Sequence, residues 1–285
     1  MTTFDVIAFD ADDTLWHSES LYAAAQEEYR RLLAPYAETE TIDRMLHQTE
    51  TRNLATYGYG IKGFALSMIE AALELSQQRV TGNEVQHVLD LAKRMLNTEV
   101  ELLEGVTEII AQLAATYPLM LITKGDLAHQ AAKIEQSGLR PYFHSIEIVT
   151  DKTSQSYATL LARHHIEPSH FLMIGNSLRS DILPVLEIGG QAVHIPYAIT
   201  WAHEHADVLP DNKAAITRSN TSGSCPHCWT GFKRLTCQPV HFASAALDDD
   251  AKSEQLSPIA RVHKATQGRR QRLGAVSERC HRART

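Results

Sequence analysis

The chain has 285 residues, of which 44% are hydrophobic and 21% charged, as is ordinary for a soluble globular protein. No apolar run approaches the roughly 18 residues that a membrane-spanning helix needs, so a membrane protein is not expected. Residues 1–10 lack the basic, apolar and small-residue segments of a secretory signal. We therefore expect a cytoplasmic protein.

Charge divides the chain into two parts. The formal net charge is -7, but residues 1–213 carry 15 Lys and Arg against 29 Asp and Glu, whereas residues 214–285 carry 12 against 5. All four cysteines fall in the second part, at Cys225, Cys228, Cys237 and Cys280. The sequence therefore predicts a boundary near residue 214, followed by an irregular, basic, Cys-containing tail with the composition of disorder.

Short apolar runs that resemble buried strands recur along the first part. They cover residues 4–10, 119–123, 145–149, 171–175 and 192–195. Helical patterns lie between the later runs, at residues 106–117, 127–137, 154–165 and 179–188. This alternation predicts an α/β fold with a doubly wound parallel sheet, built from residues 1–16 and 104–213.

The interval between the first two runs is too long for one crossover helix. Residues 17–103 have helical periodicity, with a capping box at Thr81 and Glu84 and a break at residues 57–60. We interpret this interval as a helical cap of about four helices, placed to close over a pocket.

Residues 214–285 show two superficial motifs. The cysteines have irregular spacing without surrounding elements, so we do not expect a zinc site. The Arg-rich residues 268–284 lack aromatic side chains for stacking, so a nucleic-acid partner is not expected. Whether this tail is folded, functional or a non-homologous extension stays open.

The strongest chemical signal follows the first strand. Asp10 and Asp12 are spaced so that one carboxylate can attack a reacting centre while the other moves protons. Ligands of open α/β sheets bind beyond the carboxyl ends of the strands, and later strands end near Thr123, Lys152 and Asp181. Such a set suits phosphoryl transfer, and the clustered carboxylates indicate Mg²⁺ as cofactor.

These motifs resemble the haloacid dehalogenase superfamily, in its phosphatase branch with a helical cap inserted after the first strand. The resemblance covers residues 4–213 and implies that Asp10 is the nucleophile and Asp12 the acid/base. It implies catalytic roles for Asp10, Asp12, Thr123 and Lys152, substrate binding by Thr123, Lys124 and Lys152, and metal binding by Asp10, Asp12, Asn176 and Asp181. Asp12 would bind the metal through its backbone carbonyl.

Two residues depart from the family pattern. Asp13 stands where many members have Gly, and Asn176 stands where many have the first Asp of the metal motif. An amide oxygen can coordinate Mg²⁺ but supplies no charge, so metal affinity is the property in question.

The sequence thus predicts a Mg²⁺-dependent phosphatase that hydrolyses a small phosphorylated metabolite through an aspartyl-phosphate. One alternative is a dehalogenase-type hydrolase of the same superfamily, which needs the nucleophile but not a proton donor two residues later. Another is a non-catalytic phosphoacceptor or binding module. The substrate and the oligomeric state are not predicted.

Overall fold

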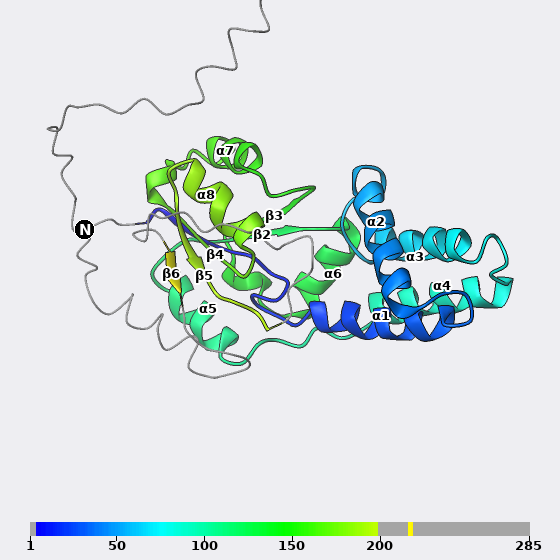
Figure 1. The fold of residues 1–285 in the computed structure, drawn as a ribbon. Helices are drawn as coiled ribbons and strands as arrows, with labels where there is room; N and C mark the ends of the chain where they lie inside the picture. Colours follow the sequence, from blue (N-terminus) through cyan, green and yellow to red (C-terminus); the bar gives the residue numbers. More distant parts are fainter. Residues whose placement is uncertain (1–3, 199–215, 219–285) are drawn as a thin grey trace, which may run out of the picture. The chain divides into compact units, whose positions relative to one another are not determined.

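A computed structural model describes residues 4–198 and the backbone of residues 216–218. Its centre is a six-stranded sheet whose pairs are all parallel, in the order β3-β2-β1-β4-β5-β6 (Figure 1). The strands are β1 (Val6–Phe9), β2 (Leu119–Lys124), β3 (Ser145–Val149), β4 (Phe171–Gly175), β5 (Gln191–His194) and β6 (Ile216–Arg218). The predicted α/β class and its parallel, doubly wound sheet are confirmed.

The central strand β1 is covered on both faces. Helices α5 (Val106–Ala114) and α6 (Leu127–Gln136) pack on one face, and α7 (Ser154–Arg163) and α8 (Leu183–Glu187) pack on the other. Phe9 contributes to the first layer with Ile110, whereas its neighbour Ala8 contributes to the second with Tyr157. Successive side chains of a strand point to opposite faces, which explains why β1 is apolar at consecutive positions.

One predicted helix is wrong in detail. Residues 179–188 do not form a single helix but a π-helical turn, Leu178–Ile182, followed by α8. Pro184 lies in the first turn of α8, where its missing N–H costs nothing. Asp181 lies in the π-helical turn, before α8 begins.

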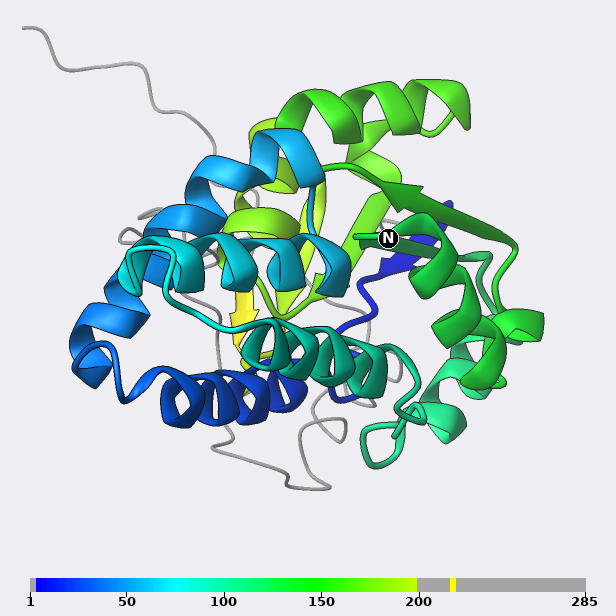
Figure 2. The same ribbon diagram turned by 90° about the vertical axis from the view of Figure 1, so that its right-hand side faces the viewer.

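The long interval after β1 forms four helices, drawn in blue to teal in Figure 2. They share a hydrophobic cluster of their own, which includes Tyr29, Met68 and Leu91. We call these helices the helical layer: α1 (Glu19–Leu33), α2 (Thr39–Tyr57), α3 (Ile61–Leu75) and α4 (Gly82–Leu96). Thr81 accepts a hydrogen bond from the backbone N–H of Glu84, whose carboxylate accepts from the N–H of Thr81. The predicted capping box is therefore present at the start of α4.

The structure describes one short element in the part of the chain that was predicted to be irregular. Residues Ile216–Arg218 form β6, which pairs in parallel with β5. Three residues carry too little periodicity to reveal a strand in sequence. The cysteines and the Arg-rich segment lie outside the described residues, and within the described part no helix is long and apolar enough to cross a membrane.

Candidate active site

The loop after β1 turns sharply because of Asp13. Its backbone has a φ of 61°, in the left-handed region that Asp adopts more readily than most residues. Its carboxylate accepts hydrogen bonds from the backbone N–H groups of Ser18 and Glu19 at the start of α1. Asp13 therefore adopts the left-handed turn and also satisfies backbone groups in the first turn of the helix. Burial raises the pKa of Asp13 to about 6.

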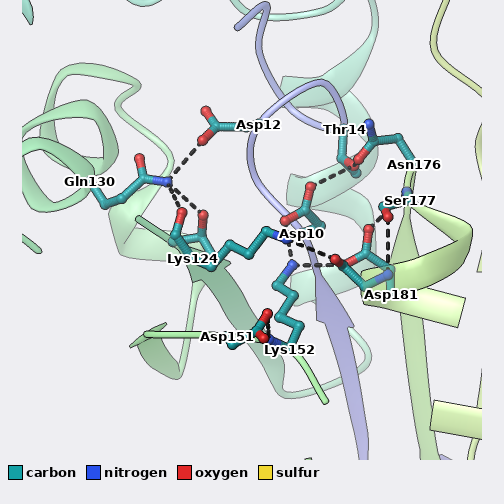
Figure 3. A network of polar contacts seen from close by, with 12 residues as sticks. Asp10, Asp12, Thr14, Lys124, Gln130, Asp151, Lys152, Asn176, Ser177 and Asp181 are labelled. Carbon is teal, nitrogen blue, oxygen red and sulfur yellow. Dashed lines mark hydrogen bonds and ion pairs between the residues drawn. The ribbon is translucent and has the colours of Figure 1, made fainter. Parts of the chain in front are cut away.

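Asp10 is joined to Asp181 through Lys152. The Lys152 ammonium donates to Asp10 Oδ1 at 2.5 Å and to Asp181 Oδ1 at 2.7 Å (Figure 3). All three residues are buried, with exposed fractions of 6%, 1% and 4% for Asp10, Asp181 and Lys152. Segments after β1, β3 and β4 thus meet at the carboxyl edge of the sheet, and the structure brings these three predicted residues together.

The charges of this cluster do not balance, because two carboxylates face one ammonium. Burial, together with the charge of Asp181, raises the pKa of Asp10 to about 7 against the lowering effect of Lys152. Burial alone would lower the pKa of Lys152, but the charges of Asp10 and Asp181 raise it well above its ordinary value. Lys152 is therefore protonated, and the cluster has room for additional positive charge.

Gly175 makes space for Asp181. A Cβ atom on Gly175 would lie 2.3 Å from Asp181 Oδ2, which is far inside van der Waals contact. The same oxygen accepts a hydrogen bond from the backbone N–H of Ser177 at 3.0 Å. The end of β4 and the following turn thus fix this carboxylate, and a side chain at position 175 is incompatible with it.

Asp12 points away from Asp10, toward α6 (Figure 3). Its carboxylate accepts from Lys133 Nζ at 2.5 Å, from Trp16 Nε1 at 2.6 Å and from Gln130 Nε2 at 2.8 Å. Burial alone would raise the pKa of Asp12, but the charge and hydrogen bond of Lys133 outweigh it, and the pKa is lowered. Asp12 is therefore ionised in this arrangement at neutral pH.

The two predicted phosphate contacts on β2 differ. Lys124 lines the cavity described below, where its ammonium donates to Ser180 Oγ at 2.8 Å and lies 4.2 Å from the ring centre of Tyr59. Thr123 is only 1% exposed, and its hydroxyl accepts from Gln130 Nε2 at 2.9 Å. Thr123 does not line this cavity, so it lies beneath the site.

Sequence reasoning missed Gln130 and Lys133. The two residues are three apart and therefore share a face of α6, a helix that begins directly after its N-cap Asp126. Two polar residues at that spacing, shortly after a strand end, were the sequence signal for additional site residues. Only the packing of α6 on the sheet directs that face of the helix toward Asp12.

The predicted metal ligands Asp10, Asn176 and Asp181 carry oxygens of the kind that a divalent cation binds. Thr14 Oγ1 lies 3.0 Å from Asp10 Oδ2 and 3.3 Å from Asn176 Oδ1, which places the predicted ligands Asp10 and Asn176 close together beside Asp181. Among the described residues no group of three His, Cys, Asp or Glu side chains is arranged for a metal. Two carboxylates and an amide suit Mg²⁺, which commonly binds proteins through few ligands and keeps several waters.

A cavity of about 140 Å³ lies over these residues. Its floor includes Asp10, Asp12 and Asp181, and its opposite wall comes from the helical layer, with Tyr22, Glu50 and Phe64 among the lining residues. Residues Gly60 and Asp126 bring the two walls together, since a Cβ on Gly60 would lie 3.2 Å from the Asp126 nitrogen. The carboxylates thus face a cavity with a partly apolar wall.

Comparison with known proteins identifies the family. A model described as a haloacid dehalogenase-like hydrolase matches residues 4–189. The chain therefore belongs to the haloacid dehalogenase-like hydrolases. A search of curated proteins finds no match.

Solved structures give the same result. A haloacid dehalogenase-like family hydrolase from Xanthomonas campestris is 39% identical, with a TM-score of 0.70, over 82% of this chain and 91% of that one. YfnB from Bacillus subtilis, a putative HAD-hydrolase bound to magnesium, is 18% identical with a TM-score of 0.51, over 68% and 89% of the two chains. A 2-haloacid dehalogenase from Pseudomonas syringae pv. Tomato is 20% identical with a TM-score of 0.51, over 82% and 100%.

Proposed function

We propose that this hydrolase is a Mg²⁺-dependent phosphatase that acts on a small phosphate monoester through an aspartyl-phosphate. The observation that carries the proposal is that Asp12 lines the same cavity as Asp10. A phosphate ester has a poor leaving group that needs a proton, whereas halide needs none. Asp12, in its protonated form, can supply that proton, so its position favours the phosphatase over the dehalogenase. The family, a hydrolase family, disfavours a non-catalytic phosphoacceptor.

Each residue then has a defined task. A carboxylate oxygen of Asp10 forms a bond to phosphorus while the ester bond breaks, and the leaving oxygen takes the proton of Asp12. Asp12 then removes a proton from water, which attacks phosphorus and releases phosphate from Asp10. Lys152 and Lys124 offset the charge of the transferred group, and the hydroxyl of Thr123 holds Gln130 beside Asp12.

The proposed metal ligands are Asp10, Asp181, Asn176 and the backbone carbonyl of Asp12. When bound, Mg²⁺ supplies positive charge to the phosphate oxygens. We also propose that residues 17–103 act as a cap on the core of residues 1–16 and 104–213. The shared lining of the cavity by both parts supports this assignment.

Phosphate release from p-nitrophenyl phosphate tests the proposal. We expect release by the parent enzyme with Mg²⁺, none in chelator, and none in Asp10→Asn under either condition. Halide release from a haloacid is the parallel assay. Halide release without phosphate release would establish the dehalogenase instead. A phosphoryl group that stays on the protein in acid, without release of phosphate, would establish a phosphoacceptor.

A further inference from the structure

Glu50 on α2 is a buried carboxylate that no described residue pairs with. It is 7% exposed and lines the cavity, but no hydrogen bond or ion pair to another described side chain or backbone group reaches it. Glu70 on the neighbouring helix is the contrast, because its carboxylate accepts from Asn53 and Tyr57, each at 2.9 Å. Glu50 therefore differs from the nearby Glu70 in having no described partner.

A carboxylate that is removed from bulk water without a protein partner is unfavourable in its charged form. Burial raises the pKa of Glu50 to about 7, and no neighbouring charge acts against it. Glu50 therefore presents a hydrogen-bond acceptor to the cavity, where a donor on a bound ligand would stabilise its charged form.

The charges of the residues around Glu50 limit which chemical groups can bind to it. Among the described lining residues, the two lysines, Lys124 and Lys133, come from the sheet side, and the helical layer contributes none. Lys133 is paired with Asp12, and Lys124 is the cation that the proposed function assigns to the transferred phosphate. A substrate with a second anionic group would therefore meet Glu50 without a cation to offset the repulsion.

We propose that Glu50 binds a hydroxyl or ammonium group on the leaving group of the substrate, which makes it a specificity-determining residue of this cavity. The inference rests on the proposed phosphatase activity. Leu54 and Phe64 line the same wall and would contact the carbon skeleton between that donor and the phosphate. The substrate class is thus a donor-bearing alkyl phosphate, either a polyol or an amino alcohol ester.

Four alkyl phosphates and one aryl phosphate, p-nitrophenyl phosphate, test the proposal in the full-length enzyme. We expect the parent to prefer glycerol phosphate or ethanolamine phosphate over propyl phosphate, and to act poorly on phosphoglycolate, which presents a carboxylate. In Glu50→Leu, kcat/KM for the preferred ester should fall by about tenfold or more, because a charge-assisted hydrogen bond is lost. Activity on p-nitrophenyl phosphate, which has no donor on its leaving group, should stay within about twofold.

Glu50→Gln separates the two donor classes. Its amide oxygen still accepts from a hydroxyl but no longer attracts a cation, so a large loss with ethanolamine phosphate and a small loss with glycerol phosphate identify the ammonium. Glu50→Gln should also improve the activity on phosphoglycolate. Glu70→Gln, whose carboxylate lies on α3 and does not line the cavity, should leave the ratios among esters unchanged.

The outcomes separate this inference from the function on which it depends. A parent that is inactive on every ester, p-nitrophenyl phosphate included, overturns both. A parent that is active, with ester ratios that do not change in Glu50→Leu and Glu50→Gln, overturns the role of Glu50 alone. Unfolding midpoints at or above that of the parent in both variants exclude misfolding as the cause of any loss.

Discussion

The Lys133 ammonium lies 2.5 Å from Asp12 Oδ1, in an ion pair that is largely shielded by the cavity wall. The pair stabilises the ionised form of Asp12, which suits the activation of water. It opposes the protonated form that the leaving oxygen requires. The two halves of the proposed reaction therefore make opposite demands on one carboxyl group, and Lys133 sets the balance between them.

Replacing Lys133 by an uncharged residue should shift the pH dependence of kcat/KM. A general acid must be protonated, so the rate falls as pH rises through its pKa, and Lys133 moves this fall to lower pH. In Lys133→Met we expect the alkaline limb of kcat/KM for an alkyl phosphate to move upward by about one pH unit. Lys62→Met removes an exposed partner of Asp126 and is the control, with an unchanged profile. Identical profiles for Lys133→Met and parent would contradict the assignment.

Asp12→Asn should separate the two chemical steps. The activated leaving group of p-nitrophenyl phosphate needs little protonation, so Asp10 should still become phosphorylated. Turnover should fall by about 10²- to 10⁴-fold, because water is no longer activated by a base. Rapid-quench measurement should show a burst of nitrophenol with slow phosphate release. Steady-state rates equal to those of the parent would eliminate Asp12 as the acid/base.

Mg²⁺ binding should depend on the protonation of Asp10. Burial raises the pKa of this carboxyl group to about 7, and the group must lose its proton to bind a cation. The Mg²⁺ affinity should therefore decline as pH falls below that value, by up to about tenfold for each pH unit. Midpoints of thermal unfolding across a Mg²⁺ titration at several pH values give the affinity. A pH-independent affinity in the parent, equal to that of Asp10→Asn, would argue against Asp10 as a ligand.

Gly175→Ala should damage the site through Asp181. The new Cβ would overlap Asp181 Oδ2, so either the carboxylate or the end of β4 must move. We expect a loss of about 1–3 kcal/mol in the free energy of unfolding, together with weaker Mg²⁺ binding. Gly82→Ala is the matched control, since its Cβ would meet no atom within 4 Å at the start of α4. Equal effects of the two substitutions on Mg²⁺ binding would refute the steric account.

The parts predicted best from sequence are those with local causes. The run before Asp10 is apolar at consecutive positions because its strand is covered on both faces, and Thr81 with Glu84 satisfies backbone groups within one turn. These patterns need no knowledge of distant residues. The strand ends also indicated correctly that Lys152 and Asp181 would approach Asp10, since parallel strands end at one edge.

The parts that sequence did not predict depend on tertiary packing. Thr123 occupies a strand end like Asp10, but Gln130 lies over it and separates it from the cavity. Lys133 reaches Asp12 because of the way α6 packs against the sheet, which no periodicity encodes. Glu50 had the appearance of an ordinary surface residue in a helix, and only the enclosure by α1 and α3 shows it to be buried.

The central place of β1 has a consequence for biosynthesis. Ile7 pairs with Leu119 on one side and with Leu172 on the other, so β1 gains its second neighbour only after most of the described chain has been made. Contacts between such distant segments form slowly, and an apolar strand with unpaired edges invites association with other nascent chains. The helical layer, whose contacts are closer in sequence, can fold during this delay, whereas the edge of the sheet that joins Asp10, Lys152 and Asp181 is completed only after β4 has been made.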